Sequence, residues 1–305
     1  MMLLALTLAF AEPIKAASTC EVATAFVGTI CTPAGAGAHP AIVVLGGSGG
    51  GDRLRGIAVR FADRGYVAAS VAYFGVAGLP PSLDEIPAET VGTALGALAK
   101  RPDVDPARIG VFGDSKGGEH ALLAASKYPE IHAVVAVVPS PFAWQGAGFG
   151  SSWTVAGKPV PYVLLDRPHR GMRSSFGGAA DMRSVYDASM QLHRGAIAGA
   201  MFALEKIAGP LLLLAGDDDA VWDSPAQCEL AMAYLRSHPH PYADEYVHYA
   251  RAGHAFVFAT TDRPEAETRF GGTPRGNVDA GAKAWTKIDE FLSRALMKDP
   301  PTPSA

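Results

Sequence analysis

Ser115 has the sequence surroundings of a catalytic nucleophile. It is the centre of a G-x-S-x-G pentapeptide that follows the apolar run at 108–113 and opens a predicted helix at about 116–126. In such a turn the serine hydroxyl projects from a strained backbone, and the glycines on either side prevent collisions with the strand and the helix. Backbone N–H groups at the start of the helix also face developing negative charge. The alternative is an ordinary glycine-rich turn in which Ser115 only caps the helix.

A nucleophilic serine needs a general base, and His254 is the candidate among nine histidines. Where the serine lies in an elbow of this kind, the acid and then the histidine follow it along the chain. His254 lies in an Ala-Gly-His-Ala tract just after a predicted strand that ends near Ala250. His248 lies inside that strand and His120 lies in the helix after Ser115, so both are expected to be packed or surface side chains.

Three consecutive carboxylates are candidates for the acid that orients this base. They follow the apolar run at 211–215 and begin directly after Gly216. Asp219, the third residue after the glycine, is the preferred acid, and Asp218 is the alternative. The remaining carboxylates of this turn are expected to be solvated.

A second glycine-rich loop, GGSGGG at 46–51, follows the apolar run AIVVL. A loop after such a strand can donate a backbone N–H to a carbonyl oxyanion. We expect Gly47 or Ser48 to supply one N–H and Lys116 to supply the other, with the Lys116 side chain in solvent. A phosphate-binding loop is the rival, but the chain has neither G-x-x-x-x-G-K-[ST] nor a G-x-G-x-x-G with a suitably placed acid.

The elements that must position these residues alternate between strands and helices. Strands are expected at 41–47, 66–74, 108–113, 132–138, 211–215 and 245–249, and helices at 53–64, 88–98, 116–126, 224–235 and 282–296. This alternation predicts an α/β fold with a mostly parallel sheet and helices on both faces. One domain is expected over 20–297. At about 139–203 the alternation breaks into Gly, Pro, Ser, Arg and aromatic residues, which predicts an inserted cap over the C-terminal edge of the sheet.

Composition excludes several classes of protein. The 305 residues are 49% hydrophobic and 18% charged, which is apolar enough for a globular core. The formal net charge of −4 offers no basic surface, so no nucleic-acid partner is expected. Three cysteines without a CxxC pair exclude a disulfide scaffold and a cysteine zinc cluster, and we expect no metal or organic cofactor.

The N-terminal residues and the cysteines bear on the compartment. Residues 1–11 contain an apolar run too short to span a bilayer and end in Ala-Phe-Ala, which is typical of a signal peptide. The protein is then expected to be exported, to the periplasm or the medium, without stable membrane insertion after signal removal; without cleavage it is expected in the cytoplasm. Cys20 and Cys31 bracket a strand-like stretch and could pair across a hairpin in an oxidising compartment. Cys228 is expected to be a small core residue.

Several tracts resemble a known family within the α/β-hydrolase superfamily. They are VLGGSGGG (44–51), VAYFGVAGLP (71–80), GDSKGGEHALLAAS (113–126), LLLLAGDDDAVWDS (211–224), RAGHAF (251–256) and GGTPRGNVDAGAKAWTKIDEFL (271–292). Together they resemble the C-terminal catalytic domain shared by acyl-CoA thioesterases and bile acid-CoA:amino acid N-acyltransferases. The resemblance implies an α/β-hydrolase fold and a hydrolase with Ser115 as nucleophile, Asp219 as acid and His254 as base. Family members that transfer acyl groups to amino acids typically carry Cys in the elbow, so Ser115 favours hydrolysis.

These observations predict a serine acyl hydrolase that cleaves an acyl thioester, with a small acyl ester or thioester as its partner and an acyl-enzyme intermediate. An exported carboxylesterase or a dienelactone-hydrolase-like enzyme for oxygen esters is the alternative. A non-catalytic binding protein with this fold is the alternative from another class. The oligomeric state is left open.

Two groups of residues in the segment at 139–203 have two interpretations each. One hypothesis is that its aromatic residues line an acyl pocket, and the other is that they form a small core of their own; they are Phe142, Trp144, Trp153 and Tyr162. For its cationic cluster the hypotheses are contact with CoA phosphates and exposure to solvent; the cluster is Arg167, His169, Arg170 and Arg173.

Overall fold

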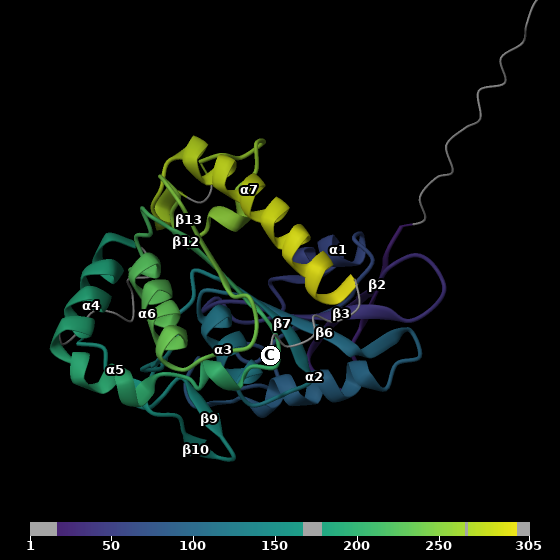
Figure 1. Ribbon diagram of the computed structural model, residues 1–305, viewed down its shortest axis with the longest axis horizontal. Coiled ribbons are helices and arrows are strands. Elements are labelled where there is room, and N and C mark those ends of the chain that lie inside the picture. The colour runs from purple at the N-terminus through teal and green to yellow at the C-terminus, as the bar shows by residue number, and fades with distance from the viewer. Residues whose placement is uncertain (1–16, 167–178, 266–267, 298–305) are drawn as a thin grey trace, which may run out of the picture.

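The computed structural model describes residues 17–166, 179–265 and 268–297, and these build a large mixed sheet. The sheet has eight strands in the order β1-β2-β4-β3-β6-β7-β12-β13 (Figure 1). The strands are β1 (Thr19–Val22), β2 (Gly28–Thr32), β3 (His39–Leu45), β4 (Val67–Val71), β6 (Val104–Asp114), β7 (Ile131–Val137), β12 (Leu211–Gly216) and β13 (Glu245–Tyr249). From β4 to β13 all neighbours are parallel, whereas β2 is antiparallel to both β1 and β4. The predicted mostly parallel α/β sheet is confirmed.

Helices cover both faces of this sheet, as the sequence predicts. The pleat of β3 explains why both are needed, because Val43 and Leu45 enter one apolar cluster while Ile42 and Val44 enter the other. The first cluster packs under α2 (Glu89–Ala99), α3 (Lys116–Ala125) and α6 (Ser224–Ser237), and the second under α1 (Arg55–Ala62) and α7 (Pro274–Leu292) (Figure 1).

The polypeptide between β7 and β12 departs from the strand-helix alternation. It forms β8 (Ala143–Trp144), β9 (Trp153–Val155), β10 (Lys158–Pro159), β11 (Tyr162–Val163), α4 (Ala179–Leu192) and α5 (Arg194–Ala200), and β9 also pairs with β5 (Ile86–Pro87). Phe142 and Trp144 are fully buried in a small apolar cluster of this segment, whereas Trp153 joins the core around α3. Tyr162 is half-buried against that core. The cationic cluster at 167–173 lies outside the described residues.

The first strands form a covalently closed hairpin at one edge of the sheet. Cys20 lies opposite Cys31 in the β1–β2 register, and the two form a disulfide. Cys228 is a free, fully buried cysteine of α6, as expected of a small core residue. Residues 1–11, the predicted signal peptide, lie outside the described residues.

The last helix begins earlier than predicted. α7 starts at Pro274 rather than 282, because the Thr273 side chain accepts a hydrogen bond from the Gly276 N–H and Pro274 suits the first helical turn. The regular helix ends at Leu292 and continues as a π-helical turn to Met297. In the described part of the chain, no helix has both the length and the apolar character needed to cross a membrane.

Candidate active site

Ser115 lies in a strained turn between β6 and α3. Its backbone has φ 57° and ψ −121°, a conformation that a residue with a side chain rarely adopts. A Cβ on Gly113 would lie 2.1 Å from the Gly117 carbonyl oxygen, and one on Gly117 would lie 2.2 Å from the Leu45 carbonyl oxygen. Both glycines are therefore needed for the close approach of strand, turn and helix.

The structure brings Ser115, His254 and Asp219 into one hydrogen-bonded chain. The His254 Nε2 lies 2.7 Å from the Ser115 Oγ, and the His254 Nδ1 lies 2.8 Å from an Asp219 carboxylate oxygen. All three side chains are buried, with exposed fractions of 7% for Ser115 and His254 and 2% for Asp219. These contacts join residues from the ends of β6, β12 and β13, which meet because parallel strands share one carboxyl edge.

Asp219, and not Asp218, faces the histidine. The second oxygen of its carboxylate accepts hydrogen bonds from the Val221 N–H at 2.8 Å and the Trp222 N–H at 3.2 Å. Asp218 is exposed, and so is Asp217. The Asp217 carboxylate pairs instead with the exposed ring of His248 at 2.8 Å.

Two further contacts hold His254 besides that with Asp219. Its backbone N–H donates to the Phe270 carbonyl at 2.9 Å, and the Trp222 ring meets the imidazole edge to face at 5.2 Å. Burial alone lowers the pKa of His254, but the charge and hydrogen bond of Asp219 and the charge of Asp114 outweigh burial and raise the pKa above its ordinary value. The imidazole is thus suited to accept a proton from Ser115.

Gly47 lies directly against Ser115. A Cβ on Gly47 would lie 3.0 Å from the Ser115 Cβ and 3.5 Å from its Oγ. Ser48 follows in the same loop and is exposed. The Lys116 N–H begins α3 immediately after Ser115, so the structure sets the candidate donor residues Gly47 and Lys116 next to the serine.

The prediction of a solvent-facing Lys116 side chain is wrong. The side chain is 6% exposed, and its Nζ contacts both carboxylate oxygens of Glu119 at 2.8 and 2.7 Å. Glu119 is fully buried and also accepts from the Trp153 Nε1 at 2.6 Å and the Trp144 N–H at 3.1 Å. Residues three apart on a helix often form an ion pair at the surface. Here strands β8 and β9 cover this face of α3, so the Lys116–Glu119 ion pair is buried.

His120 is a packed side chain, as expected. It is fully buried, with its ring stacked on Trp153 at 4.3 Å and edge-on to Tyr73 at 4.9 Å. Glu119, which pairs with the Lys116 side chain next to Ser115, is a neighbour of the site that the sequence pattern did not single out. The three-residue spacing of Lys116 and Glu119 was the available signal for the ion pair.

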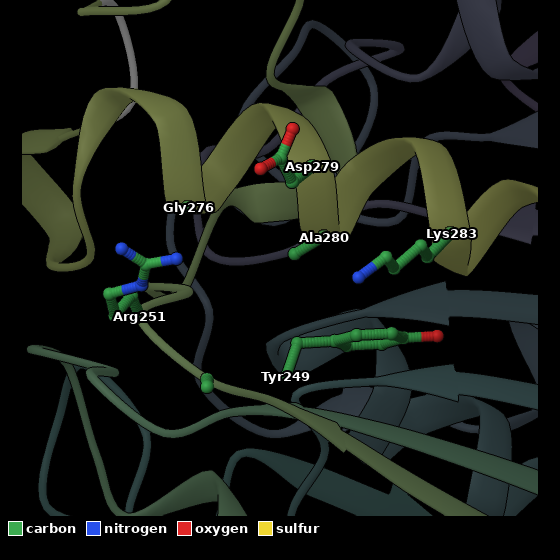
Figure 2. Close-up of a pocket in the computed structure, with 7 residues that line it drawn as sticks. Tyr249, Arg251, Gly276, Asp279, Ala280 and Lys283 are labelled. Atoms are coloured by element: carbon green, nitrogen blue, oxygen red, sulfur yellow. The ribbon is translucent and has the colours of Figure 1, made fainter.

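A small polar pocket of about 140 Å³ lies elsewhere, between the end of β13 and the first turns of α7. In Figure 2 Arg251 and Lys283 border it from either end, with the Tyr249 ring below. None of Ser115, Asp219 and His254 lines this pocket. Within the described ranges, no group of three His, Cys, Asp or Glu side chains is placed to hold a metal ion.

Comparisons with known proteins find one matching family. Residues 92–298 match the family model described as BAAT / Acyl-CoA thioester hydrolase C terminal. Acyl-coenzyme A thioesterase 6 of Mus musculus is 28% identical over 90% of this chain and 64% of its own. Acyl-coenzyme A amino acid N-acyltransferase 2 of Rattus norvegicus is 28% identical over 89% of this chain and 64% of its own. The chain thus spans slightly less than two thirds of these relatives.

Solved structures share the fold. A putative dienelactone hydrolase from Klebsiella pneumoniae subsp. pneumoniae covers 92% of this chain and 100% of its own at a TM-score of 0.61 and 18% identity. At this identity the likeness shows the α/β-hydrolase fold alone.

Proposed function

Because the chain belongs to the BAAT / acyl-CoA thioester hydrolase C-terminal family, we propose that it is a serine acyl hydrolase that cleaves an acyl thioester. The observation that carries the proposal is the buried hydrogen-bonded chain from Ser115 through His254 to Asp219. A serine in a positive-φ turn, a base within 2.7 Å and an acid behind the base form the arrangement that acyl transfer requires.

In the first half of the reaction the Ser115 Oγ attacks the substrate carbonyl carbon while the His254 Nε2 takes the hydroxyl proton. The carbonyl oxygen becomes an oxyanion, which the Lys116 N–H and the N–H of Gly47 or Ser48 stabilise. The intermediate then collapses, the bond from carbon to the leaving sulfur or oxygen breaks, and His254 returns the proton to that leaving group. The acyl group remains on Ser115 as an oxygen ester.

In the second half a water molecule attacks the acyl-enzyme, and His254 takes its proton. A second oxyanion forms and collapses, the bond to the Ser115 Oγ breaks, and the proton passes from His254 to that oxygen. Asp219 fixes the tautomer of the ring and stabilises the imidazolium. The buried carboxylate and its two backbone donors support this role.

Hydrolysis rather than transfer to an amino acid is supported by Ser115 itself. The family resemblance associates amidation with a Cys elbow, whereas this chain has serine. Its acyl-enzyme is an oxygen ester, which reacts more slowly with amines than a thioester does, so water is the acceptor that we propose.

The disulfide supports a second candidate, an exported esterase for oxygen esters. A Cys20–Cys31 bond is typical of oxidising compartments, where CoA thioesters are not expected. With the signal-like sequence at 1–11, it leads us to propose export with cleavage before Glu12. N-terminal sequencing of the protein from a periplasmic or culture fraction tests this, and a mature chain that retains Met1 contradicts it.

A substrate panel separates the two candidates. Purified protein and Ser115→Ala are assayed against acyl-CoAs and p-nitrophenyl esters of matched chain length. Dominant acyl-CoA turnover that falls at least about 10³-fold in Ser115→Ala supports the thioesterase. Turnover of the nitrophenyl esters alone assigns the esterase. Activity that survives in Ser115→Ala contradicts both, and no turnover of either panel by the native protein favours a non-catalytic role.

A further inference from the structure

We propose that Tyr73 is a positioning residue for the oxyanion hole, because its hydroxyl holds the Gly46 carbonyl and so directs the Gly47 N–H toward the forming oxyanion. The inference rests on the proposed function and adds to it a residue that does not itself touch substrate. It predicts that one buried hydroxyl group, outside the triad, controls the rate of the chemical step.

The Tyr73 hydroxyl is buried beside the Gly46 carbonyl oxygen. The residue is 3% exposed, and the hydroxyl donates to the Gly46 carbonyl oxygen. The ring is enclosed by aromatic side chains, with centroid distances of 4.9 Å to His120, 5.3 Å to Phe74 and 5.8 Å to Trp153. Burial, with the charges of Glu119 and Asp114, raises the pKa of Tyr73, so the hydroxyl stays protonated and remains a donor.

The Gly46 carbonyl has little room to turn. A Cβ on Gly117 would lie only 2.5 Å from the Gly46 oxygen, so this oxygen packs against the first turn of α3 where Gly117 has no side chain. The Tyr73 hydroxyl holds the same oxygen by its hydrogen bond. Helix α3 limits the position of the carbonyl, and Tyr73 supplies the attraction that fixes its direction.

The direction of that carbonyl sets the direction of the next N–H. The Gly46 C=O and the Gly47 N–H belong to one planar peptide group, and the described residues contain no cis peptide bond. In a trans peptide the two bonds point in opposite directions. The hydrogen bond from Tyr73 therefore turns the Gly47 N–H away from Tyr73, while Gly47 itself lies against the Ser115 side chain.

The rest of the loop is anchored independently. The Gly51 N–H donates to the Phe74 carbonyl at 2.9 Å, and the Asp52 carboxylate accepts from the Thr29 hydroxyl at 2.6 Å and from the Ser70 hydroxyl. Loss of the Tyr73 hydroxyl alone should thus release the Gly46–Gly47 peptide without unfolding the loop.

Tyr73→Phe tests the proposal, with Tyr66→Phe as the matched control. Tyr66 is also 3% exposed, but it lies in the cluster on the opposite face of the sheet. The substrate is whichever of butyryl-CoA and p-nitrophenyl butyrate the native protein turns over, and a butyl trifluoromethyl ketone, which forms an oxyanion on a reactive serine, is the inhibitor. Loss of a whole oxyanion donor costs about 10²–10³-fold in kcat, so we expect Tyr73→Phe to lower kcat by about 10- to 100-fold, with KM changed by less than about threefold.

The affinity for the ketone distinguishes loss of an oxyanion donor from a general loss of stability, which would not weaken binding of the ketone specifically. We expect its affinity to fall by the same factor as kcat/KM in Tyr73→Phe and to be unchanged in Tyr66→Phe, with both variants melting as cooperatively as the native protein. Amide hydrogen exchange should quicken at Gly47 in Tyr73→Phe. An unchanged kcat, or a loss through KM with full ketone affinity, overturns the role of Tyr73 while Ser115→Ala remains inactive. Full activity in Ser115→Ala overturns the proposed function and this inference with it.

Discussion

At the scale of single residues, Asp219 is the carboxylate whose surroundings differ most from those of its neighbours. Its backbone donors and its bond to His254 use both oxygens, whereas Asp218 is exposed. We expect Asp219→Asn to lower kcat by about 10³–10⁴-fold, because the amide no longer fixes the tautomer or stabilises the imidazolium. Steady-state hydrolysis of the best panel substrate is the measurement.

Asp218→Asn is the matched control for that variant. It makes the same chemical change one residue away on an exposed side chain, so kcat should stay within about twofold of the native value, as is usual for surface substitutions. Equal losses in the two variants would mean that the acidic turn acts by its summed charge rather than through the Asp219–His254 bond.

The pH dependence follows from the environment of His254. Asp219 and Asp114 raise its pKa against the opposing effect of burial. Only the neutral ring accepts the serine proton, so kcat/KM should rise with pH through a midpoint above about 6.5, the ordinary value for histidine. In Asp219→Asn the midpoint should move down, since burial then acts with less opposition. A native midpoint below about 6.5 would contradict this assignment.

Much of the site could be predicted from the sequence because its residues occupy fixed points of the chain. Ser115 lies between a strand and a helix, and His254 follows a strand, so local pattern was sufficient to select them. The Lys116 side chain could not be placed in this way. Its burial depends on β8 and β9, which cover α3 but follow it in the sequence only after β7.

At the scale of elements, His240 lies in the loop before β13 and links that loop to Ile207 and, through Asp244, to the start of β12. Its Nδ1 lies 2.9 Å from the Asp244 carboxylate and its Nε2 lies 2.8 Å from the Ile207 carbonyl oxygen, while Asp244 accepts from the Leu211 N–H at the start of β12. Burial lowers the pKa of His240, but the hydrogen bonds to Asp244 and Ile207 and the charges of Asp244 and Glu205 outweigh it, and the pKa is raised.

A raised folded-state pKa makes this junction most stabilising when His240 is protonated. The contribution is complete below about pH 6.5, the unfolded value, and is lost as pH rises through the folded-state pKa. Urea unfolding of the native protein and His240→Gln, whose side chain does not titrate, should show a larger difference in unfolding free energy at pH 6 than at pH 9. An equal difference in unfolding free energy at pH 6 and pH 9 would exclude a stabilising contribution from protonated His240.

The sequence pattern predicted least well the bounds of those elements that depend on close backbone contacts. The start of α7 was predicted too late because Gly276 and Gly281 weaken the helical signal. Both glycines are required, since a Cβ would lie 2.3 Å from the Arg251 carbonyl oxygen and 2.6 Å from the Phe256 carbonyl oxygen, respectively. The two- and three-residue strands β8 to β11 are too short to show an alternation of apolar residues.

At the scale of the whole molecule, the Cys20–Cys31 disulfide closes the hairpin that edges the sheet. A bond between cysteines 11 residues apart restricts the unfolded chain by about 3 kcal/mol in the chain-entropy description. Reductant should thus lower the unfolding free energy by about that amount in urea titrations. The Cys20→Ser/Cys31→Ser double variant should have the unfolding free energy of the reduced protein, and reductant should not change it. No response of the native protein to reductant would mean that the bond does not contribute to global stability.

The central claim is that Ser115 is an activated nucleophile at the carboxyl edge of the sheet, with His254 as its base. Labelling with a fluorophosphonate, followed by peptide mass spectrometry, tests it without knowledge of the natural substrate. The account predicts one adduct, on the peptide that contains Ser115, with labelling strongly slowed in His254→Ala. An unlabelled protein, an adduct on another residue, or undiminished labelling in His254→Ala would contradict it.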